Sequence, residues 1–162
     1  MRKALTLSTT FLFSFITLYS QNNIKTNALS FELGKTGLIY NLSFDHRINK
    51  KNIGFRFSVG SNFAKYLNGF STVGGGFFLI GKNKKFLELG IDAGLLKVDE
   101  VSDDQKGFSL IFPDYSIKTF YAGLNAGVRL YRENSLFRLG LSPGIIKDGF
   151  LPGGYISLGF IF

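Results

Sequence analysis

The chain has 162 residues, a formal net charge of +8 and no cysteine. A length of this order suits a single domain. With 45% hydrophobic residues, 19 phenylalanines and 20 glycines, the composition excludes a disordered protein, because so apolar a chain buries itself against some other surface. The absence of cysteine excludes disulfides, cysteine-based metal sites and a lipidated cysteine anchor.

The first twenty residues have the layout of a secretory signal peptide. Arg2 and Lys3 precede an uncharged apolar stretch over 4–19, and the sequence turns polar at Gln21. The apolar stretch is short for an anchor helix, and no later stretch reaches the roughly 18 to 20 apolar residues of a spanning helix. We therefore expect a signal peptide over 1–20, cleaved near Ser20. The mature domain is then 21–162, and loss of Arg2 and Lys3 lowers the net charge from +8 to +6.

Alternation of apolar with small or polar residues dominates the rest of the chain. Side chains two positions apart share one face of a strand, so each alternating segment has one apolar and one polar or small face. The phase of 70–81 stays open, because glycines interrupt the run STVGGGFFLI. The expected strands, eight in all, cover residues 28–33, 38–47, 53–60, 70–81, 87–94, 120–130, 137–142 and 155–162.

Short polar turns alternate along the chain with the other links. The short turns are expected at 49–52, 82–85 and 132–135. The remaining links are a tight glycine-bounded turn at 34–37 and the segments 62–69, 97–116 and 145–153. This alternation predicts an antiparallel up-and-down meander with two distinct ends.

The composition of the polar faces indicates which side of the sheet lies inside. They are rich in glycine, which a narrow barrel interior needs and a solvent-facing strand does not. They also combine acids with arginine and no lysine, and arginine suits confined ion pairs. These charged residues are Glu32, Asp45, Glu88, Asp92, Arg47, Arg56, Arg129 and Arg138. We therefore predict an all-β fold, an eight-stranded antiparallel transmembrane β-barrel with its apolar faces toward lipid and its charges in the lumen.

Hairpin register predicts which lumen charges meet. A two-residue turn centred on Lys50 and Lys51 sets Asp45 opposite Arg56. A similar turn at 133–134 sets Arg129 opposite Arg138, and like charges in such positions repel unless an acid lies nearby. Glu88 is the best candidate for that acid. The expected lumen ion-pair network is Asp45, Arg56, Glu88, Arg129 and Arg138, in the half of the barrel next to the short turns.

The last residues alternate up to an aromatic one. Tyr155, Leu158, Phe160 and Phe162 resemble the C-terminal assembly signal of outer-membrane barrel proteins, with Ser157 where a glycine is commonest. With the signal peptide, this resemblance covers the whole chain, which is similar in size and strand number to the OmpA-like and OmpX-like barrel families. The resemblance implies a bacterial outer-membrane location, contact with outer-membrane lipid and recognition by the barrel-assembly machinery. It also implies short turns in the periplasm and the other links outside.

The sequence offers little catalytic chemistry. Some eight-stranded outer-membrane barrels are lipid A-modifying enzymes that use a serine, a histidine and an acid. Here the only histidine, His46, has no Ser-x-His or His-x-Ser pattern beside it, so we expect it to be structural and the protein not to be an enzyme. One histidine without cysteine predicts no metal site, and the glycines at 74–76 begin no helix and predict no nucleotide site. No cofactor and no nucleic-acid partner are expected.

Several functions stay open on the sequence alone. The favoured one is a structural, adhesion or partner-binding barrel that acts through its outer links, with an unidentified partner for 97–116. A narrow passive channel is the alternative, although an eight-stranded lumen is only wide enough for its own side chains. A lipid A-modifying enzyme is a weaker alternative, as is a soluble ligand-carrying barrel with its apolar faces turned inward.

Overall fold

The structure, a computed structural model, describes most of the expected barrel. The described residues are 25–35, 38–48, 51–61, 69–98, 117–147 and 149–162. The predicted signal peptide and most of the predicted links 62–69 and 97–116 lie outside them. Within these ranges there is no helix that is both long and apolar enough to cross a membrane.

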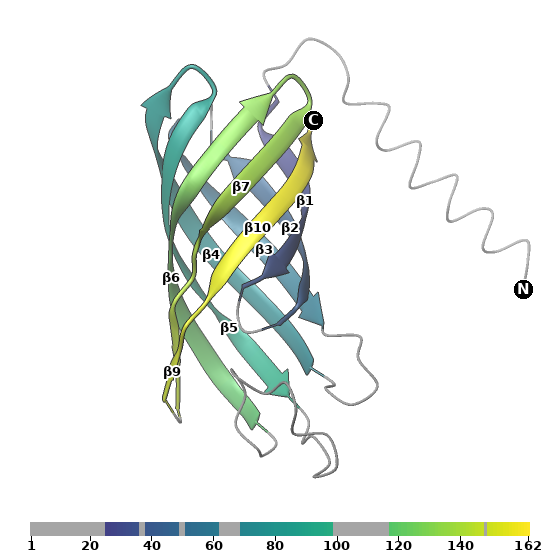
Figure 1. Cartoon of the computed structure of the whole chain (residues 1–162), viewed down its shortest axis with the longest axis vertical. Helices are drawn as coiled ribbons and strands as arrows, with labels where there is room; N and C mark the ends of the chain where they lie inside the picture. Colours follow the sequence, from purple (N-terminus) through teal and green to yellow (C-terminus); the bar gives the residue numbers. More distant parts are fainter. Residues whose placement is uncertain (1–24, 36–37, 49–50, 62–68, 99–116, 148) are drawn as a thin grey trace, which may run out of the picture.

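Antiparallel strands form one sheet that closes on itself (Figure 1). The strands are β1 (Asn27–Gly34), β2 (Tyr40–Arg47), β3 (Ile53–Ser61), β4 (Gly69–Lys82), β5 (Lys85–Val98), β6 (Ile117–Arg132), β7 (Ser135–Leu141), β8 (Gly144–Ile146), β9 (Gly149–Leu151) and β10 (Gly154–Ile161). β1 to β7 pair in chain order, β8 pairs with β6 and β9, and β10 pairs with β7 and with β1, which closes the ring.

Four of these segments make up two continuous strands. β7 and β8 keep one register against β6, in which Gly127 lies opposite Gly140 and Gly123 opposite Gly144. Backbone hydrogen bonds carry the ladder across the break, because Leu124 N donates to Pro143 O at 2.9 Å. β9 and β10 continue each other in the same way. The predicted closed eight-stranded antiparallel barrel is therefore confirmed.

The predicted link at 145–153 is wrong. Most of that segment is strand, and only 147–148 separate β8 from β9. Proline and several glycines between 143 and 154 favour a loop by local preference. Strand pairing overrides this preference, because β8 pairs with β6 and β9 pairs with β8. Between these segments the ladder continues, since Ser142 N donates to Gly153 O at 2.8 Å.

The phase of β4 is regular despite its glycines. Ser71, Val73, Phe77 and Leu79 are buried in the lumen, whereas Phe70, Phe78 and Ile80 are exposed on the outer face. Gly74 to Gly76 keep the same extended strand, but because glycine has no side chain the sequence does not show which face each of them is on. The strand therefore contributes large apolar groups to both faces of the sheet.

The outer face carries an apolar belt, as predicted. Large side chains such as Phe57, Leu124 and Leu158 are 52%, 60% and 63% exposed. Serine, asparagine and charged residues are buried on the opposite face of the same strands. A surface of this kind suits lipid, because in water the whole apolar belt would remain exposed to solvent.

Candidate functional site: the closed lumen

The lumen contains a buried network of ion pairs that begins at the register pair of β2 and β3. Asp45 and Arg56 lie opposite each other. The guanidinium donates to both carboxylate oxygens, Nε to Oδ1 at 2.6 Å and a terminal nitrogen to Oδ2 at 3.0 Å. This two-pronged geometry is the strongest form of the pair. Both side chains are almost fully buried.

Glu88 joins three arginines at the centre of the network. Its Oε1 accepts from Arg56 at 2.8 Å and from Arg138 at 2.9 Å, and its Oε2 accepts from Arg129 at 2.6 Å. Arg129 also reaches Asp45 at 2.5 Å. The structure thus brings together all five residues of the expected network, from β2, β3, β5, β6 and β7. Two acids against three arginines leave an excess of positive charge at this level.

A second group of charges balances that excess on the loop side of the network. Arg138 forms an ion pair with Glu32 of β1. Lys35 Nζ lies 2.9 Å from Asp92 Oδ2, and the same carboxylate oxygen accepts from Asn125 Nδ2 at 2.7 Å. Glu32 and Asp92 were expected to face the lumen, and they do. They also join the ion-pair network, which is therefore larger than the five residues expected.

Lys35 is a lumen residue that sequence reasoning missed. The alternation places arginines inside and lysines in turns, yet Lys35 is 1% exposed. The backbone explains this, because Gly34 and Lys35 both have positive φ, 77° and 69°. Two successive left-handed residues turn the end of the hairpin over the lumen. A lysine next to a glycine in a predicted turn was the available signal, and it is a weak one.

An apolar cluster fills the lumen beyond the charges. It consists of Leu38, Val73, Leu96, Tyr121, Ile146 and Leu151. Leu38 was expected on the outer face with Tyr40, and that prediction is wrong, since Leu38 is 1% exposed. It lies outside β2, on the same inturned hairpin as Lys35, where strand alternation no longer holds.

Aromatic rings and glycines complete the filling of the lumen. The Arg129 guanidinium lies 4.4 Å from the centre of the Phe77 ring, and that of Arg138 lies 4.9 Å from the Tyr155 ring. Gly127 and Gly140 make room for Tyr155, because a Cβ on either would lie within 3.0 Å of its hydroxyl oxygen. Small residues on this face are therefore required by close approach, as the narrow-lumen argument predicts.

Arg47 lies apart from this network, at the end of the lumen near the short turns. Its guanidinium lies 5.7 and 5.6 Å from the ring centres of Phe86 and Tyr131, which are themselves 5.8 Å apart. These three residues line a hollow of about 410 Å³ with Lys25 and Lys84. Arg47 was expected in the lumen with the other charged residues, and it lies instead at the open end of the lumen.

His46 has structural contacts. Its Nδ1 lies 2.7 Å from Asn27 Oδ1, and its ring packs 5.0 Å from that of Phe55. Both contacts are to cross-strand neighbours. Among the described residues, no group of three or more acidic, histidine or cysteine side chains is arranged to hold a metal ion.

The four residues of the expected assembly signal lie at the closure of the barrel. Tyr155 faces the lumen, and Leu158 and Phe160 lie on the apolar belt. The main chain of Phe162 exchanges hydrogen bonds of 3.1 and 3.0 Å with that of Asn27. The C-terminal residues therefore seal the junction of β10 with β1.

Comparisons with known proteins show the fold. No protein-family model and no curated protein sequence matches the chain. The N-terminal β-barrel domain of OprF from Pseudomonas aeruginosa is similar in structure, with a TM-score of 0.64 at 16% identity over 87% of this chain and 100% of that one. The outer membrane protein Ail of Yersinia pestis, in a phospholipid bilayer nanodisc, has a TM-score of 0.50 at 14% identity over 86% of this chain and 100% of that one. The chain therefore has the fold of the small eight-stranded outer-membrane β-barrels, the architecture predicted from its sequence.

Proposed function

We propose that the protein is a non-conducting scaffold of the bacterial outer membrane. The barrel anchors the chain in lipid, and its outer links bind a partner outside the cell or contribute to adhesion. The observation that carries this proposal is the filled lumen. Arg129, Arg138 and Glu88 are completely buried at one level, and Leu38, Leu96 and Tyr121 are buried at the next.

A filled lumen argues against the passive-channel alternative. An ion crossing the barrel would have to pass the side chains of Glu88 and its three arginine partners. Breaking a buried pair costs about 3–5 kcal/mol, because the remaining charge is left uncompensated. The enzyme alternative has no support from His46, whose described contacts are structural.

Conductance measurements test the closed lumen. The refolded mature chain is added to planar lipid bilayers at neutral pH, with a large general porin as positive control. We expect no stepwise conductance from this protein under conditions in which the porin gives clear steps. Reproducible ohmic steps from a preparation of folded, monodisperse barrel would favour the channel instead.

The outer links are the proposed interaction surface. Residues 99–116 lie outside the described residues, so the proposal rests on the length and acidic composition of the predicted 97–116 link. Intact cells carrying the wild type are compared with cells in which 99–116 is replaced by a Gly-Ser segment of equal length. We expect the replacement to abolish partner capture or adhesion while the folded barrel stays abundant. Unchanged capture would remove this link from the proposal.

Export is part of the same proposal. The signal peptide over 1–20 delivers the 21–162 domain to the envelope, where the barrel-assembly machinery inserts it. N-terminal sequencing of the protein from outer-membrane fractions is expected to begin at or near Gln21. A mature protein that retains Arg2 and Lys3 would contradict the signal-peptide interpretation.

A further inference from the structure

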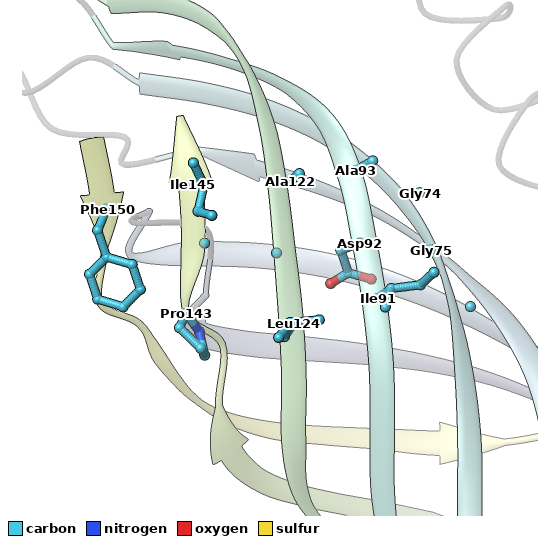
Figure 2. Close-up of a pocket in the computed structure, with 13 residues that line it drawn as sticks. Gly74, Gly75, Ile91, Asp92, Ala93, Ala122, Leu124, Pro143, Ile145 and Phe150 are labelled. Carbon is cyan, nitrogen blue, oxygen red and sulfur yellow. The ribbon is translucent and has the colours of Figure 1, made fainter. Parts of the chain in front are cut away.

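A groove of about 640 Å³ crosses the outer, lipid-facing surface over β4, β5, β6 and β8 (Figure 2). Its floor is a row of small residues in register on three adjacent strands, Gly74 opposite Ala93 and Ala93 opposite Ala122. Ile91 and Leu124 form one wall, and Ile145 and Phe150 close one end. A volume of this size lies within the roughly 300–1,000 Å³ typical of ligand pockets.

Close packing does not require the glycines that line the groove. A Cβ on Gly74 would have its nearest neighbour, the Arg56 carbonyl oxygen, at 4.0 Å, and one on Gly76 would have the Gly54 oxygen at 3.8 Å. Neither glycine has a positive φ. Elsewhere the same face carries large side chains such as Phe57 and Leu158. The groove therefore interrupts the belt at a place where larger residues would fit.

Lysines stand above the groove at the end of the barrel away from the short turns. Lys97 of β5 and Lys118 of β6 are cross-strand neighbours, and both are exposed. One outward-facing pair, Leu95 and Phe120, separates them from the Ala93–Ala122 floor. Lys147 is also exposed, and it directly follows Ile146 of β8, which pairs with Tyr121 of β6. Three exposed lysines thus lie beyond the end of the apolar groove that is away from the short turns, on or next to the strands that line it.

We propose that this groove and its lysines bind a phosphorylated, multiply acylated lipid of the outer leaflet, of the lipid A class. An acyl chain lies over Gly74, Ala93 and Ala122, and the phosphates contact Lys97, Lys118 and Lys147. The inference rests on the proposed outer-membrane location and orientation. An apolar, concave surface excludes a polar ligand, and cations at a membrane surface attract anionic head groups. A second copy is disfavoured, because a two-fold interface here would bring the lysines of both copies together.

Lipid retention tests the site in the folded barrel. The mature barrel is reconstituted into phosphatidylcholine nanodiscs that contain diphosphorylated lipid A, dephosphorylated lipid A or phosphatidylglycerol, and the lipids retained on release are counted by native mass spectrometry. We expect retention of the diphosphorylated form over the other two. Lys97→Glu with Lys118→Glu should reduce it about tenfold or more, since each surface cation contributes appreciably to such attraction.

Matched variants separate the groove from general charge and size effects. Lys82→Glu with Lys85→Glu reverses another exposed cross-strand pair, at the other end of β4 and β5, and should leave retention unchanged. Gly74→Leu or Ala122→Leu fills the groove and should reduce retention, whereas Val128→Leu, elsewhere on the outer face, should not. Folding of each variant is checked by heat-modifiable mobility, and either groove variant suffices if the other fails to fold.

Three results would overturn the inference. They are equal retention of phosphatidylglycerol, full retention by a folded groove-filled variant, and a specific dimer cross-linked through Ala93 or Ala122. None of these depends on conductance or cell-surface exposure, so failure of the lipid site is distinguishable from failure of the scaffold proposal.

Discussion

Glu88 and Arg138 lie 50 positions apart in the sequence and meet in the lumen. The Arg138 guanidinium donates to Glu88 Oε1 at 2.9 Å and to Oε2 at 3.2 Å. Both side chains are completely buried. Glu88 also binds Arg56 and Arg129, so a single carboxylate joins three strands that carry like charges.

Removal of this carboxylate should destabilise the barrel strongly. Glu88→Ala leaves three buried arginines with fewer partners, and breaking a buried pair typically costs about 3–5 kcal/mol. We expect a lower free energy of unfolding in urea titrations of the barrel in lipid vesicles. Asp104→Ala, in the predicted 97–116 link, is the control and should cost far less. Equal losses from the two substitutions would mean that the network contributes little.

Much of this network follows from the sequence, because the position of a two-residue turn determines which residues of its two strands lie opposite each other. Once the short turns are located, Asp45 must face Arg56, and Arg129 must face Arg138, as the strand pairs of the structure do. Alternation then assigns each side chain to the lumen. Glu88 could be added because its distance from the 82–85 turn gives its level in the barrel.

The inturned hairpin could not be predicted in this way. Alternation assumes extended backbone, and the positive φ of Gly34 and Lys35 breaks it. This change carries Lys35 and Leu38 into the lumen against their parity. For the opposite reason 145–153 was predicted as a link, because local glycine and proline preferences do not reveal the cross-strand hydrogen bonds that keep β8 and β9 in the sheet.

Reversal of the charge at the hairpin should release it from the lumen. Lys35→Glu places a carboxylate beside Asp92 and Glu32, where Lys35 Nζ now lies 2.9 and 3.9 Å from their oxygens. We expect a loss of stability comparable to that of Glu88→Ala and faster proteolysis near 34–39. Lys51→Glu, in an exposed turn, should have little effect. The double variant Lys35→Glu with Asp92→Lys should recover part of the loss, and absence of any recovery would contradict a specific pair.

Close approach in the lumen predicts different tolerance at two glycines. A Cβ on Gly140 would lie 2.5 Å from the Ala126 carbonyl oxygen and 2.7 Å from Gly127 Cα. Gly140→Val should therefore prevent folding or cost several kcal/mol by overpacking. Gly74→Val, on the open outer face, should fold normally. The fraction of heat-modifiable barrel after refolding measures both, and similar yields would argue against a tightly filled lumen.

The orientation of the barrel can be read from protease cleavage. Short turns of bacterial barrels lie in the periplasm and the longer links outside. We expect protease added to intact cells to cut within 97–116 and to spare the lysines at 50, 51, 84 and 85. Permeabilised cells provide the control in which both ends are accessible. Cleavage at Lys51 or Lys84 in unbroken cells would reverse the orientation, and with it the leaflet of the proposed lipid site.

The C-terminal aromatic residue should affect assembly more than its apolar area explains. Phe162 joins β10 to β1 through main-chain hydrogen bonds, which Phe162→Ala preserves while removing the ring. The ring also packs 5.7 Å from that of Phe160. Phe57→Ala, at a 52% exposed position within β3, removes the same ring from the belt without touching the C-terminus. We expect far less folded protein in outer-membrane fractions of Phe162→Ala cells than of Phe57→Ala cells, whereas the two purified variants should refold similarly in detergent. Equal amounts in the membrane would show that the assembly machinery does not read this residue.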